Sequence, residues 1–117
     1  MVYDIKTVPE DTPIWCTGFR FDDTKAGIKC EPVFGTFEER SCYSKFHTLS
    51  NKTRSKTFSV GANPDFYRFA DTYEEAATEY NGMIFAAKYE LIKKQEYLEQ
   101  CLLADKNGSV YNRVSMQ

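Results

Sequence analysis

Apolar and polar positions divide this chain into a strand-like part, which ends near residue 70, and a helical part from residue 72 to about residue 104. No proline interrupts the helical part, and good helix formers dominate it. Thr72 and Glu75 have the spacing of a capping box, which favours a helix start at this point. Apolar or small residues recur along it at steps of three and four, interrupted at Lys94, and so predict one helix face: Ala77, Tyr80, Ile84, Ala87, Leu91, Leu98 and Cys101.

The strand-like part alternates with period two most clearly over residues 14–21. Trp15, Phe19 and Phe21 fall on one face of this predicted strand, whereas Ile14 and Cys16 fall on the other. Further short segments have strand character and are separated by turns rich in Pro, Gly, Asn and Asp: residues 2–8, 28–37, 42–47, 57–61 and 66–70.

Together these elements predict an α+β fold, with a small curved antiparallel sheet or an SH3-like barrel of 4-5 strands followed by one long C-terminal helix. We expect a single domain over residues 1–104 and a C-terminal tail over residues 105–117. The helix should cover the aromatic face of the sheet, which predicts one set of side chains buried together: Trp15, Phe19, Phe21, Phe34, Phe69, Tyr80, Ile84 and Ala87.

The predicted helix is longer than such a sheet requires. A helix over residues 72–104 would be about 50 Å long, whereas a six-residue strand spans only about 20 Å. Either the helix bends near Gly82 or Lys94 and folds back, or its far end is a contact surface for a second copy or another protein. The second interpretation predicts a set of partner-binding residues: Tyr97, Leu98, Cys101 and Leu102.

Composition argues for a binding protein rather than an enzyme. The formal net charge of −2 gives no general attraction to nucleic acid or membranes, and no apolar run is long enough to span a membrane. The four cysteines have irregular spacing, and no signal peptide precedes them, so we expect reduced thiols in a cytoplasm. His47 is the only histidine, and neither a catalytic motif nor metal-ligand spacing accompanies it. We therefore expect no catalytic residue, no bound metal and no cofactor.

The basic segment over residues 40–56 indicates an alternative function, namely a nucleic-acid-binding module. Its cations are interleaved with Tyr43, Phe46 and His47, as on many surfaces that bind single strands. The whole chain has 15 basic and 17 acidic residues, however, which favours a solvated basic hairpin. The nucleic-acid-binding residues of this alternative would be Arg40, Lys45, Lys52, Arg54 and Lys56.

In residues 66–76 an aromatic strand enters a helix through Thr72, Glu75 and Ala76, and Tyr80, Asn81 and Ile84 follow. This junction resembles small accessory proteins of tailed bacteriophages. This resemblance implies a short protein made inside an infected bacterium. It also implies attachment to a host protein, including enzymes of bacterial defence, which the protein would inhibit or redirect. We therefore expect a non-enzymatic binding protein in the cytoplasm of a bacterial host cell.

Overall fold

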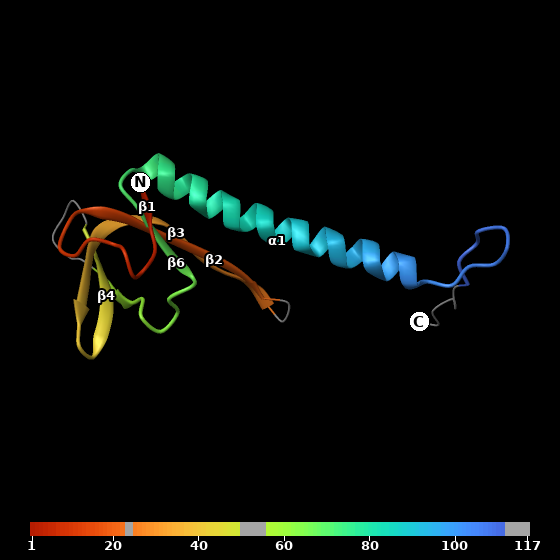
Figure 1. The fold of residues 1–117 in the computed structure, drawn as a ribbon, viewed down its shortest axis with the longest axis horizontal. Helices are drawn as coiled ribbons and strands as arrows, with labels where there is room; N and C mark the ends of the chain where they lie inside the picture. The colour runs from red at the N-terminus through yellow and green to blue at the C-terminus, as the bar shows by residue number, and fades with distance from the viewer. Residues whose placement is uncertain (23–24, 50–55, 112–117) are drawn as a thin grey trace. The chain divides into compact units, whose positions relative to one another are not determined.

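The computed structural model describes residues 1–22, 25–49 and 56–111 and contains a sheet followed by one long helix (Figure 1). It divides into two compact units, residues 1–87 and residues 88–117, which are described separately below. The elements in chain order are β1 (Val2–Tyr3), β2 (Ile14–Asp22), β3 (Lys25–Arg40), β4 (Tyr43–Thr48), β5 (Thr57–Ser59), β6 (Tyr67–Ala70) and α1 (Tyr73–Cys101).

The six strands form one open sheet in the order β1-β6-β2-β3-β4-β5. Every neighbouring pair is antiparallel, and β1 and β5 are the two edges. The predicted α+β fold with a C-terminal helix is confirmed, and the sheet is open rather than closed into a barrel. It has six strands because all six segments with strand character pair, including the two-residue β1.

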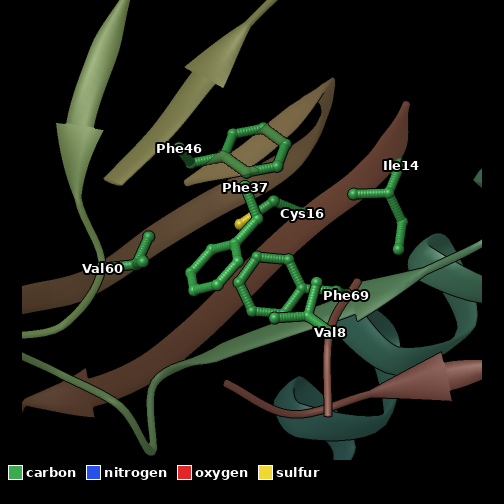
Figure 2. Packing of buried hydrophobic residues seen from close by; sticks show 7 residues of the cluster. All are labelled: Val8, Ile14, Cys16, Phe37, Phe46, Val60 and Phe69. Atoms are coloured by element: carbon green, nitrogen blue, oxygen red, sulfur yellow. The ribbon is translucent and has the colours of Figure 1, made fainter. Parts of the chain in front are cut away.

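The buried core lies on one face of this sheet and is centred on three phenylalanine rings (Figure 2). Phe37 and Phe69 have ring centroids 5.6 Å apart, and Phe46 and Phe69 have centroids 6.0 Å apart. Burying such a ring contributes about 1.5–3 kcal/mol to folding. The buried cluster comprises Val8, Ile14, Cys16, Phe37, Phe46, Val60 and Phe69. Val8 and Val60 come from loops, so segments between strands complete this core.

The opposite face of the sheet packs against the first turns of α1. Trp15 has its ring centroid 5.1 Å from those of both Phe34 and Tyr73, and Phe19 lies 6.1 Å from Tyr80. Ala76 is the buried residue of α1 at this contact. The rings of Trp15, Phe19, Phe34 and Tyr80 are half-buried, whereas Tyr73 is exposed.

The predicted core is therefore wrong in its composition. Of its members, Phe69 is fully buried, but it lies on the other face of the sheet, opposite Cys16. Phe21 is 43% exposed, and the remaining members are only partly buried. Alternation correctly separates the two faces of β2, yet both faces carry apolar side chains. Val8 and Val60, which are distant from β2 in sequence, pack on the face that carries Cys16, and this face is therefore the better covered one.

The start of α1 follows the predicted capping box. The backbone N–H of Glu75 donates to Thr72 Oγ1 (3.2 Å), and the backbone N–H of Thr72 donates to Glu75 Oε1 (3.2 Å). These reciprocal bonds satisfy backbone groups that a helix start otherwise leaves unpaired. From there α1 continues without a break to Cys101, through both Gly82 and Lys94.

The second unit contains the last turns of α1 and a tight turn that follows them. Ala104 and Val110 form an antiparallel bridge, and the backbone N–H of Tyr111 donates to the carbonyl of Leu103 (3.0 Å). Asp105 Oδ1 accepts backbone hydrogen bonds from Asn107 (2.8 Å) and Ser109 (2.9 Å). Within the described residues, no helix is both long enough and apolar enough to cross a membrane.

Candidate interaction surface

The last turns of α1 and the residue after it expose apolar side chains. Tyr97, Leu98 and Leu102 are 65%, 63% and 56% exposed, and Cys101 is also exposed. Residues 97, 98 and 101 lie within one turn of each other on the helix, and Leu102 follows its last residue. We call these four residues the distal helix surface. All the predicted partner-binding residues are thus accessible.

A shallow depression borders the distal helix surface. It is lined by Glu90, Lys93, Lys94, Tyr97 and Leu98, and its lining is mainly apolar. Glu90, Lys94 and Leu98 follow one another at intervals of four residues, so the aliphatic stem of Lys94 lies between Leu98 and Glu90 along the helix. This arrangement combines an apolar floor with a charged rim, as is typical of surfaces that bind other proteins.

The free energy gained by burying the distal helix surface can be compared with the free energy that a stable complex requires. Completely burying a Leu or a similar side chain contributes about 1.5–3 kcal/mol, so three side chains that are about 60% exposed offer roughly 3–5 kcal/mol. Micromolar binding needs about 8 kcal/mol after the entropic cost of association. Micromolar binding at the distal helix surface would therefore require contacts with further side chains.

Among the predicted nucleic-acid residues, Arg40 is paired with neighbouring carboxylates. The Arg40 guanidinium lies 2.7 Å from Glu38 Oε2 and 3.8 Å from Glu10 Oε1. Lys45 Nζ lies 4.5 Å from the ring centroid of Tyr43. Lys56 is exposed, and its backbone bonds to Thr48. The other two predicted residues, Lys52 and Arg54, lie outside the described residues.

His47 lies in a cross-strand hydrogen-bond network. Its Nδ1 is 2.8 Å from Thr57 Oγ1, and its Nε2 is 2.7 Å from Glu38 Oε1. The hydrogen bond from His47, followed by the charge of Arg40, lowers the pKa of Glu38. A carboxylate, an imidazole and a hydroxyl in sequence also occur in nucleophilic sites. Here His47 and Thr57 lie side by side because they are paired directly across β4 and β5. Three pronounced depressions of the described surface are lined by other residues.

One pair of cysteines could not be foreseen from the sequence. Cys16 on β2 and Cys30 on β3 are diagonal neighbours across the two strands, and all four cysteines are free. Their separation in sequence matches no thiol motif, and only the β2–β3 register brings them together.

Among residues 1–22, 25–49 and 56–111, no group of three or more His, Cys, Asp or Glu residues is arranged to hold a metal ion. No family model matches the chain, and neither does any curated protein or solved structure.

Proposed function

We propose that this protein is a non-enzymatic binding protein that attaches to another protein through the distal helix surface. The observation that supports this function is the exposure of Tyr97, Leu98, Cys101 and Leu102 at the end of α1. Monomeric soluble proteins rarely expose a large contiguous apolar patch unless a partner covers it. The charged rim formed by Glu90, Lys93 and Lys94 adds specificity to such a contact.

The resemblance of residues 66–76 to phage accessory proteins supplies the setting of the proposal. In that setting the protein acts in the cytoplasm of an infected bacterium. Its partner is a host protein, including an enzyme of bacterial defence, which it inhibits or redirects. Attachment to a host protein follows by analogy with the phage proteins, whereas the exposed side chains of α1 support the contact surface.

Affinity capture from a bacterial lysate tests the proposal. Leu98→Glu places a charge at the centre of the distal helix surface and should abolish capture of a specific partner. Gln100→Glu is the matched control, because it adds the same charge two residues away, on the opposite side of the helix, at an exposed position. Loss of the partner with Leu98→Glu alone supports the proposal. Equal capture by both variants and the parent would contradict it.

A second copy of this chain is the other protein that can cover the surface, in a homodimer formed through the C-terminal helix. Light scattering on the purified protein separates the two partners. A dimer that Leu98→Glu converts into a folded monomer identifies the second copy as the partner. A parent monomer that captures a host protein identifies a heterologous contact.

A further inference from the structure

We propose that the Thr57 hydroxyl is an acyl-acceptor site, in which His47 removes the hydroxyl proton and Glu38 orients the imidazole while an activated ester transfers its acyl group to Thr57. The three residues lie on β5, β4 and β3 and include no residue of the distal helix surface. The site takes up one acyl group per chain. It therefore adds a covalent modification to a binding protein, without catalytic turnover.

Two hydrogen bonds connect the three side chains in the order that proton transfer requires. His47 Nδ1 lies 2.8 Å from Thr57 Oγ1, and His47 Nε2 lies 2.7 Å from Glu38 Oε1. A nucleophile is activated when a base lies within about 2.6–3.2 Å of it and a third group orients that base. Both distances meet this requirement.

The carboxylate of Glu38 fixes the positions of the protons. The hydrogen bond with His47, followed by the charge of Arg40, lowers the pKa of Glu38 and keeps this carboxyl group ionised. An ionised carboxylate only accepts hydrogen bonds, so His47 Nε2 carries a proton and donates to Oε1. The Arg40 guanidinium lies 2.7 Å from the other oxygen, Oε2, and leaves Oε1 to the imidazole. In the neutral imidazole Nδ1 then has a free lone pair, to which the Thr57 hydroxyl donates.

The exposure of the three side chains matches these roles. The side chains of Glu38 and His47 are 20% and 33% exposed, so their contact is partly shielded from water. Thr57 is exposed on the edge strand β5, where an acyl donor can reach its hydroxyl. The rings of Phe46 and Phe58, which form the neighbouring pair across β4 and β5, have centroids 5.6 Å apart and hold β5 in this register.

The reaction balances with p-nitrophenyl acetate as the activated ester. Thr57 Oγ1 attacks the carbonyl carbon while its proton moves to His47 Nδ1, and the ionised Glu38 stabilises the imidazolium that forms. The bond between the carbonyl carbon and the phenolic oxygen then breaks. Thr57 becomes an acetyl ester, p-nitrophenolate leaves, and His47 releases the proton to solvent.

Treatment of the full chain with p-nitrophenyl acetate, followed by peptide mapping with mass spectrometry, tests the proposal. Thr78 is the internal control, because it is also exposed but donates its hydroxyl to the carbonyl oxygen of Glu74 (2.8 Å) and has no base as partner. General base catalysis contributes about 100-fold or more, so Thr57 should be acetylated about 100-fold faster than Thr78. Equal rates at the two threonines would overturn the proposal.

Variants then assign the roles, with circular dichroism to verify that each one folds. Thr57→Ser should keep acetylation at residue 57, whereas Thr57→Val, which retains a β-branched side chain in β5, should abolish it. His47→Gln should slow acetylation of Thr57 by about 100-fold and leave Thr78 unchanged. Acetylation of Thr57 at the parent rate in folded His47→Gln would refute the role of the imidazole.

Glu38 is a positioning residue, because it acts on Thr57 only through His47. Glu38→Gln should therefore slow acetylation of Thr57 in the parent and have no further effect in the His47→Gln background. A purely structural contribution of Glu38 would slow the reaction equally in both backgrounds, and that result would contradict its assigned role.

Discussion

The substitution Gly35→Ala tests how closely β3 and β4 approach each other at the edge of the buried core. Gly35 is paired with Thr48 on β4 and with Ile14 on β2. A Cβ atom at Gly35 would overlap the carbonyl oxygen of His47 and would lie 2.7 Å from Phe46 Cε2. The His47 carbonyl belongs to the backbone of a paired strand, and the Phe46 ring is fully buried. Neither can move without disturbing the sheet.

The expected loss of stability follows from these contacts. Overpacking of a close-packed interior costs about 1–3 kcal/mol, and Gly35→Ala belongs at the upper end of this range because a backbone atom is involved. The lower entropy of the unfolded alanine variant offsets about 0.4–1 kcal/mol. A net loss of about 2 kcal/mol corresponds to a decrease of roughly 8 °C in melting temperature for a chain of 117 residues.

Thermal unfolding followed by circular dichroism measures this loss. Gly82→Ala is the matched control, because a Cβ at Gly82 meets nothing within 4 Å and the residue lies inside α1. This second change should raise the stability by about 0.5–1 kcal/mol, since alanine favours helix. If Gly35→Ala is as stable as the parent, the proposed approach of β3 and β4 is incorrect.

Three further predictions concern the core, the His47 network and the basic segment. Phe69→Ala should lower the free energy of unfolding by about 3–5 kcal/mol, whereas Phe21→Ala should change it far less, and equal losses in denaturant titrations would refute the assigned core face. Because the folded state depresses the pKa of Glu38, its contribution to stability is present above the usual value of 4.5 and is lost as pH falls through the folded value. The stability difference between the parent and Glu38→Gln should therefore shrink below pH 4.5, and a difference that is constant with pH would refute this linkage. If Arg40, Lys45 and Lys56 bind phosphates, single-strand affinity should fall by roughly 0.7 log units per log unit of salt for each contact, and absence of binding at about 50 mM salt would exclude this function.

Local sequence signals predicted the elements of the fold. The capping box of Thr72 and Glu75 marks the helix start in the structure, and alternation over residues 14–21 marks β2. The long helix also indicated the exposed residues Leu98 and Leu102, because their position follows from helix length and spacing alone.

Features that depend on strand register could not be predicted in this way. The contacts of His47 with Glu38 and Thr57 require the pairing of β3, β4 and β5. Likewise, the Cys16–Cys30 pair requires the shifted register of β2 and β3. Alternation within one strand contains no information about which residue lies opposite on another.

The central claim is that a partner protein covers the distal helix surface. Hydroxyl-radical footprinting of the captured complex and of the free protein tests it most directly, because side-chain oxidation reports solvent access at individual residues. We predict that Tyr97, Leu98 and Leu102, which are exposed in the free chain, become protected in the complex, while the exposed Phe21 on β2 keeps its reactivity. Unchanged oxidation of Tyr97, Leu98 and Leu102, with protection confined to the sheet, would contradict the proposed contact surface.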